Sequence, residues 1–72
     1  MKNNIYLKEM GKRVKTIRKA KKITLDQFSK MSGLDVSNIS LLENGKRNPH
    51  LLTLKNIADK LNVDIMELIT RY

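Results

Sequence analysis

The chain has 72 residues, no cysteine, three aromatic residues and a formal net charge of +8. This length predicts one small domain with a modest core, for which dimerisation is a natural way to gain stability. The lack of thiols excludes a disulfide framework and a thiolate metal site, and no apolar run is long enough for a membrane span or a signal peptide. We therefore expect a single cytoplasmic domain over residues 1–72.

The first predicted element is a basic helix over about residues 7–21. Met10, Val14 and Ile17 recur at helical spacing and predict its buried stripe. The first 22 residues hold nine cations and one anion, whereas the six cations and six anions after them balance. The whole excess of +8 thus lies in the first third of the chain, which suits a polyanion such as nucleic acid. A merely solvated lysine-rich face is the alternative, and a membrane is disfavoured because the core needs the apolar side.

The next elements, over residues 24–45 (TLDQFSKMSGLDVSNISLLENG), have the spacing of two short helices joined by a tight turn. Thr24 and Gln27 form the pattern of a capping box, which starts a helix at about residue 25. Gly33 ends that helix, because glycine tolerates the positive φ of a tight C-terminal turn. Asp35 then caps the second helix. This arrangement is typical of a helix-turn-helix, whose second helix enters the major groove of DNA.

The two faces of this second helix have different predicted roles. Ile39 and Leu42 face the core, as Phe28 and Met31 do in the helix before it. The residues left outside or at the edge, which we expect to contact bases, are Val36, Ser37, Asn38, Ser40 and Leu41. Asparagine pairs with adenine and aliphatic groups contact thymine methyls, which favours an A·T-rich operator. Alternatively, the two apolar members pack in a core or a protein contact, and DNA shape supplies the specificity.

Two more helices are predicted after the polar loop KRNPH. Pro49 helps to fix the entry to the first, and Asn62 closes it. Its apolar side comprises Leu51, Leu54, Ile57, Ala58 and Leu61. A box-like pair, Asp64 and Glu67, starts a last helix that ends near Tyr72. Its apolar side comprises Ile65, Leu68 and Ile69. Five helices and no strand predict an all-α domain.

The segment IRKAKKITLDQFSKMSGLDVSNISLLENGKRNP resembles the lambda-repressor-like (Cro/repressor, XRE) helix-turn-helix family, and the resemblance extends over about residues 10–69. It implies a compact five-helix domain that binds operator DNA as a two-fold homodimer and regulates transcription. The operator is then an inverted repeat, with recognition helices about 34 Å apart. No cofactor, metal ion or small-molecule ligand is expected.

The resemblance also assigns individual residues. It implies that Arg18 and Glu43 form a partly buried ion pair that orients two helices; otherwise both are ordinary surface residues. Three positions depart from the family pattern: Leu25 replaces a glutamine that contacts a phosphate, Lys22 replaces a glycine, and Leu41 stands where Arg or Lys is common. A leucine cannot make the bidentate contact to guanine that supplies much direct readout.

Two further surfaces are predicted from position along the chain. The predicted phosphate contacts are Arg13, Lys15, Lys19, Asn44, Lys46 and Arg47. Asn44 serves equally well as a helix C-cap. The predicted dimer interface is Asn62, Ile65, Ile69 and Tyr72. The same apolar side chains complete the core of a monomer in the alternative interpretation.

Catalysis is not expected. His50 is the only histidine, and no cysteine or acidic pair lies at ligand spacing from it. The serines have no adjacent base to activate them. The remaining functional alternative is a protein-interaction module, such as an antitoxin or an anti-repressor, which uses exposed apolar residues such as Leu25, Leu41, Leu52 and Met66.

Overall fold

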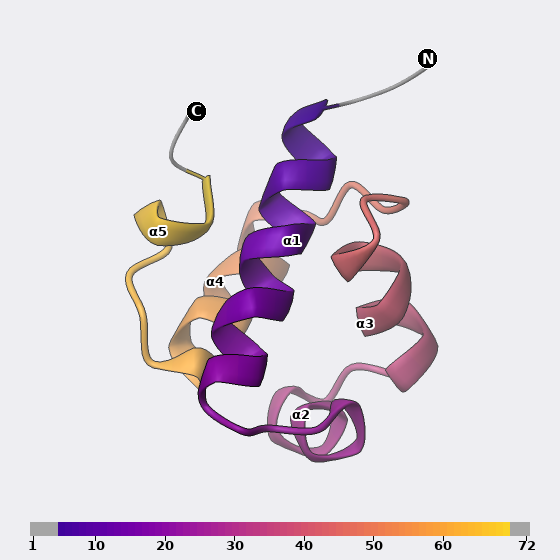
Figure 1. The fold of residues 1–72 in the computed structure, drawn as a ribbon, viewed down its shortest axis with the longest axis vertical. Helices are drawn as coiled ribbons and strands as arrows, with labels where there is room; N and C mark the ends of the chain where they lie inside the picture. Colours follow the sequence, from indigo (N-terminus) through magenta and orange to yellow (C-terminus); the bar gives the residue numbers. More distant parts are fainter. Residues whose placement is uncertain (1–4, 70–72) are drawn as a thin grey trace.

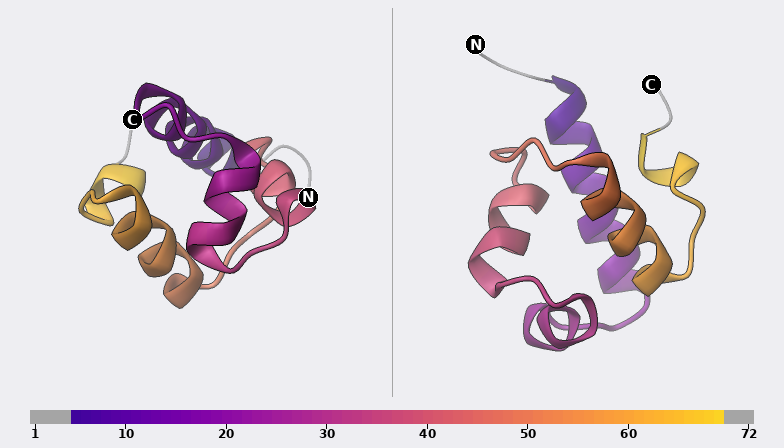
Figure 2. Two further views of the ribbon diagram at one scale, coloured as in Figure 1. Left: turned by 90° about the horizontal axis from the view of Figure 1, so that it is seen from below. Right: turned by 180° about the vertical axis from the view of Figure 1, so that it is seen from behind.

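In a computed structural model of the chain, residues 5–69 are described, and they form five helices without a strand (Figure 1). The helices are α1 (Ile5–Ala20), α2 (Leu25–Ser32), α3 (Val36–Glu43), α4 (Leu51–Leu61) and α5 (Met66–Ile69). The long helix α1 lies between α3 and α5, and α4 covers the other side of α1 (Figures 1 and 2). The predicted all-α, five-helix architecture is confirmed.

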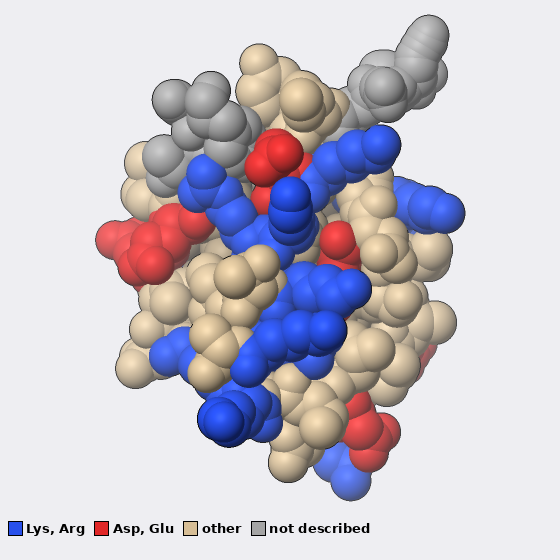
Figure 3. Space-filling model, viewed as in Figure 1, with Lys and Arg blue, Asp and Glu red and all other residues tan. Residues whose placement is uncertain are grey.

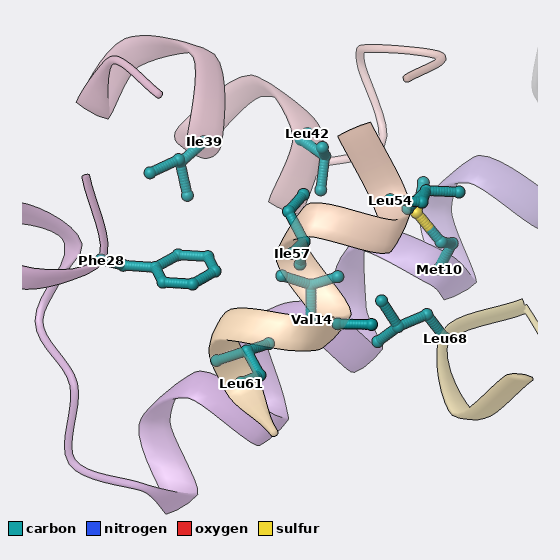
Figure 4. Packing of buried hydrophobic residues seen from close by; sticks show 10 residues of the cluster. Met10, Val14, Phe28, Ile39, Leu42, Leu54, Ile57, Leu61 and Leu68 are labelled. Carbon is teal, nitrogen blue, oxygen red and sulfur yellow. The ribbon is translucent and has the colours of Figure 1, made fainter. Parts of the chain in front are cut away.

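The core lies where the five helices converge (Figure 4). The buried hydrophobic residues are Met10, Val14, Phe28, Ile39, Leu42, Leu54, Ile57, Ala58, Leu61 and Leu68. Full burial of a large apolar side chain contributes about 1.5–3 kcal/mol. Helices of eight residues are unstable alone in water, so this shared core holds α2 and α3 in place.

The ends of α2 lie where the sequence predicts them. The Thr24 hydroxyl accepts a hydrogen bond from the backbone N–H of Gln27 at 3.0 Å, and the Gln27 side-chain oxygen accepts one from the N–H of Thr24 at 2.9 Å. Gly33 closes the helix at a φ of 79°. The prediction that Met31 faces the core with Phe28 is wrong in part: Met31 is 40% exposed because it lies about 60° further around the helix, at the edge of the buried face.

The other helices also begin and end close to the predicted residues, but two side chains at their starts do not behave as predicted. Lys22 after α1 and Asn62 after α4 both have a φ of 60°, which is the left-handed conformation. Asp35 occupies the predicted N-cap of α3, but its side chain makes no capping hydrogen bond. The prediction that Leu51 faces the core is wrong: it is 66% exposed, because it is the first residue of α4 and no other element packs over it.

The last helix is shorter than predicted. It forms one turn, Met66–Ile69, in which Leu68 is fully buried, and Tyr72 lies outside the described residues. Asp64 starts the turn by accepting a hydrogen bond from the N–H of Met66 at 3.1 Å. None of the helices within residues 5–69 is long and apolar enough to cross a membrane.

Candidate nucleic-acid interface

A buried ion pair joins α1 to the last turn of α3. Arg18 and Glu43 are 5% and 6% exposed. The Arg18 guanidinium donates from Nε to Oε2 of Glu43 at 2.7 Å and from Nη2 to Oε1 at 3.1 Å, and its Nη1 donates to the carbonyl oxygen of Ile23 at 2.7 Å. Bidentate, charge-assisted bonds of this kind fix both distance and angle. The pair therefore sets the orientation of α3 relative to α1.

A glycine that the sequence reasoning missed allows the same two helices to approach closely. Gly11 is buried in α1, and a Cβ added there would meet the carbonyl oxygen of Leu42 and lie 2.7 Å from that of Glu43. Only a residue without a side chain allows the α3 backbone to come this near. The sequence contained a sign of this close approach, because Gly11 lies seven residues before Arg18 and therefore on the same side of the predicted helix.

The outward face of α3 carries the predicted base contacts, but they do not all lie on one line. Ser37 and Leu41 are exposed on the side opposite the core. Val36 and Ser40 precede Glu43 by seven and three residues and so share its side of the helix, towards α1. All four side chains are at least partly accessible to a ligand.

Asn38 lies on the opposite flank of α3, against the loop that follows the helix. After α3 the chain turns back along the helix. The turn contains Gly45, at a φ of 74°, and is held by a hydrogen bond from the N–H of Lys46 to the carbonyl oxygen of Leu41. This return places Arg47 beside Asn38, and Nη2 of Arg47 donates to Oδ1 of Asn38 at 2.7 Å. Sequence reasoning assigned these two residues to different roles and did not pair them.

Exposed cations lie over α1 on the face shown in Figure 3. The exposed lysines of this helix are Lys8, Lys12, Lys15 and Lys19. They recur at intervals of three or four residues and therefore form one stripe. None of them pairs with an acidic side chain within residues 5–69.

The remaining predicted phosphate contacts divide into two groups. Asn44, Lys46 and Arg47 are exposed at the C-terminal end of α3. The backbone N–H of Asn44 closes the helix by donating to carbonyl oxygens of α3, which leaves its side chain exposed. Arg13 lies elsewhere: its Nη1 donates to the carbonyl oxygen of Glu67 at 3.1 Å, so its guanidinium sits against α5 and not beside α3.

Three of the four predicted dimer residues, Asn62, Ile65 and Ile69, lie within the described residues, at the end of α4 and in the segment that follows it, and Tyr72 lies outside them. Asn62 is exposed, Ile65 packs partly against the core, and Ile69 is 43% exposed. Ile69 also borders a shallow apolar groove with Tyr6 and Pro49. The structure thus divides the predicted set: Ile65 belongs largely to the core, and Ile69 faces outward.

Together, two short helices cross at a glycine turn, and the outer face of the second lies exposed between cationic segments. This fold and surface define a helix-turn-helix domain of the DNA-binding type.

Comparisons with known proteins agree with this class. A family model described as helix-turn-helix matches residues 14–68. The HTH-type transcriptional repressor RghR of Bacillus subtilis (strain 168) is 33% identical over 58 residues, 79% of this chain and 43% of RghR. The uncharacterized HTH-type transcriptional regulator y4dJ of Sinorhizobium fredii (strain NBRC 101917 / NGR234) is 35% identical over 63 residues, 88% of this chain and 82% of y4dJ. This chain thus spans less than half the length of RghR but most of y4dJ.

The structural comparison gives the same result. The restriction-modification controller protein C.AhdI from Aeromonas hydrophila matches with a TM-score of 0.87 and 31% sequence identity, over 90% of this chain and 98% of that chain. The chain therefore belongs to the lambda-repressor-like helix-turn-helix family, whose members are DNA-binding regulators of transcription.

Proposed function

We propose that this protein regulates transcription by binding a specific double-stranded DNA sequence with α3 in the major groove. The observation that carries the proposal is the placement of α3. Its inner face is fixed by the Arg18–Glu43 pair, and its outer face is exposed between the lysines of α1 and the cations at 46–47. An α-helix fits the width of the major groove, and flanking cations neutralise the phosphates on either side.

The exposed residues suggest a division of roles. Ser37 and Leu41 lie at the centre of the outer face, so we assign base contacts to them first, with Val36, Asn38 and Ser40 at the flanks. Phosphate contacts are assigned to five exposed polar and basic residues of α1 and of the segment that follows α3, which are Lys15, Lys19, Asn44, Lys46 and Arg47. Arg13 is left out of this set because its guanidinium donates a hydrogen bond to the backbone of Glu67 in α5.

We further propose that two copies bind an inverted repeat. A two-fold dimer places its recognition helices about 34 Å apart, one turn of DNA. Ile69, which is 43% exposed in α5, is the natural centre of the contact between copies, and the exposed Asn62 and the partly buried Ile65 are the other described residues that we assign to it. Ile69→Lys should then yield a monomer in sedimentation equilibrium while its circular dichroism spectrum stays helical.

Selection of bound duplexes from a random pool, at about physiological salt, tests the DNA-binding proposal. The enriched duplex is then titrated against a scrambled one over a range of salt concentrations. We expect an inverted repeat that binds about a thousandfold more tightly than the scramble. With six to ten phosphates neutralised, the logarithm of affinity should fall with the logarithm of salt concentration at a slope of about −5 to −9.

Matched variants separate the two kinds of contact. Leu41→Ala should change the selected bases, whereas Leu52→Ala, which truncates another exposed leucine on α4, should not. Lys46→Ala should weaken binding to all sequences alike and make the salt slope shallower by about 1, whereas Lys60→Ala on α4 should leave it unchanged. Equal binding of both duplexes would reject the proposed function and favour a protein-interaction module.

A further inference from the structure

The turn that follows α3 packs directly against the first half of α1 (Figure 1). A Cβ added to Gly45 would lie 2.8 Å from both Cα and Cγ of Lys8 and 3.1 Å from its backbone nitrogen. Gly45 therefore does more than adopt a φ of 74°, because it also leaves the space that the backbone and the side-chain stem of Lys8 occupy. The side chain of Lys8 thus starts beside the end of α3.

This contact brings together two lysines that are far apart in the sequence. Lys46 follows Gly45 directly, so the Cα atoms of Lys8 and Lys46 lie within about 8 Å of each other. Both lysines are exposed, and neither pairs with an acidic side chain within residues 5–69. Two flexible cations anchored at this separation repel one another, because it does not exceed the Debye length of about 8–10 Å near physiological salt.

The acidic residues closest to this pair along the chain are not available to it. Glu43 accepts two hydrogen bonds from the buried Arg18, at 2.7 and 3.1 Å. Glu9 borders a shallow hollow together with Glu67, on the side of α1 that faces α5. The carbonyl end of α3 offers only about half a unit of negative charge, which does not balance two lysines. The packing at Gly45 therefore favours an anionic ligand beside the two lysines.

A strand of DNA has negative charges at a spacing that suits this pair. Successive phosphates of one strand are about 3.4 Å apart along the axis of the duplex, and a lysine is a point charge on a long, flexible stem. Two such stems anchored this close together can reach phosphates of the same short stretch. We propose, building on the function above, that Lys8 is a further phosphate contact, on the same stretch of strand as Lys46. The DNA interface then extends from the loop after α3 to the first half of α1.

Titration of the full chain with the selected and the scrambled duplex, over a range of salt concentrations, tests this contact. Lys8→Ala should make the salt slope shallower by about 1 for each copy bound, as Lys46→Ala should, and the double variant by about 2. Base preference should not change, because a phosphate contact does not read sequence directly. Lys12→Ala is the matched control, since it removes an exposed lysine one turn further along α1, where that lysine borders the hollow on the α5 side.

The control decides whether the position of Lys8 matters. Lys12→Ala should leave the salt slope unchanged. An equal change in Lys8→Ala and Lys12→Ala would overturn the inference, because it would show that α1 attracts DNA through its total charge and not through a contact at the turn.

Duplexes in which one phosphate at a time is replaced by an uncharged methylphosphonate locate the contact on the selected operator. Each lysine variant should lose its sensitivity to replacement of the phosphate that its own lysine contacts. We expect the positions found with Lys8→Ala and with Lys46→Ala to lie on one strand, within about three nucleotides of each other. Positions on opposite strands, or farther apart on one strand, would overturn the inference.

Thermal unfolding of the free protein separates this role from a structural one. If Lys8 only balanced the negative end of α3, Lys8→Ala would lower the melting temperature and leave the salt slope unchanged, and this result would overturn the inference. We expect no fall in melting temperature at low salt, since the loss of one lysine relieves repulsion. All of the overturning results leave the proposed function standing, whereas that function fails if the unaltered protein selects no sequence.

Discussion

Removal of one member of the Arg18–Glu43 pair should strongly destabilise the protein. In Glu43→Leu the Arg18 guanidinium remains buried, and of its three hydrogen bonds only the one to the carbonyl oxygen of Ile23 survives. An uncompensated charge in such a site costs about 3–5 kcal/mol. A domain of this length has a free energy of unfolding of about 4–11 kcal/mol in total. The loss is therefore a large part of the stability, and we expect the melting temperature to fall by more than about 12 °C.

Urea denaturation followed by circular dichroism measures this loss. The double variant Arg18→Met/Glu43→Leu removes both charges, and we expect it to regain most of the stability, since apolar replacements of buried pairs are often neutral or stabilising. Asp59→Ala, which breaks the exposed pair with Lys55, is the control and should cost less than about 1 kcal/mol. The reasoning is refuted if Glu43→Leu costs no more than this control.

Three further changes test the backbone geometry by thermal unfolding. Gly11→Ala should destabilise the fold by about 3 kcal/mol or more, because the new methyl group overlaps the carbonyl oxygen of Leu42; Gly33→Ala, where the added carbon meets nothing, should cost only the 1–2 kcal/mol of its left-handed φ, and equal losses would contradict the argument. Lys22→Gly should stabilise by about 0.5–1 kcal/mol, since the relief of strain exceeds the added backbone entropy, and a loss would count against it. Thr24→Ala should cost about 1 kcal/mol through the lost cap, and no change in melting temperature would exclude a stabilising capping box.

The features predicted well from sequence are those that depend on near neighbours along the chain. The capping box at Thr24 and Gln27, the left-handed glycine at Gly33 and the buried stripe that begins at Met10 each involve residues within one or two helical turns. Local hydrogen bonding and side-chain periodicity determine them, so the spacing of the residues is sufficient. The exposure of Leu51 was predicted wrongly because periodicity identifies an apolar face but not whether another element covers it.

The site could be predicted less well, because its geometry depends on contacts between distant segments. Asn38 and Arg47 were both assigned to DNA, yet their mutual hydrogen bond depends on how the loop turns at Gly45. Arg13 was grouped with the other basic residues by charge alone, and its bond to the backbone of Glu67 depends on where α5 packs. Net charge locates a polyanion-binding region but does not say which cations face it.

The two surfaces around α3 differ in how firmly they are held, and this difference bears on specificity. On the side of α1, a bidentate ion pair and the close approach at Gly11 fix the helix itself. On the loop side, a single exposed hydrogen bond holds Asn38 against Arg47. Substitutions on the first side should therefore change stability and all DNA contacts together, whereas substitutions on the second side should change base preference in a protein that remains folded. On the proposed function, we therefore expect substitutions on the loop side of α3 to change the operator that this domain prefers while its core stays intact.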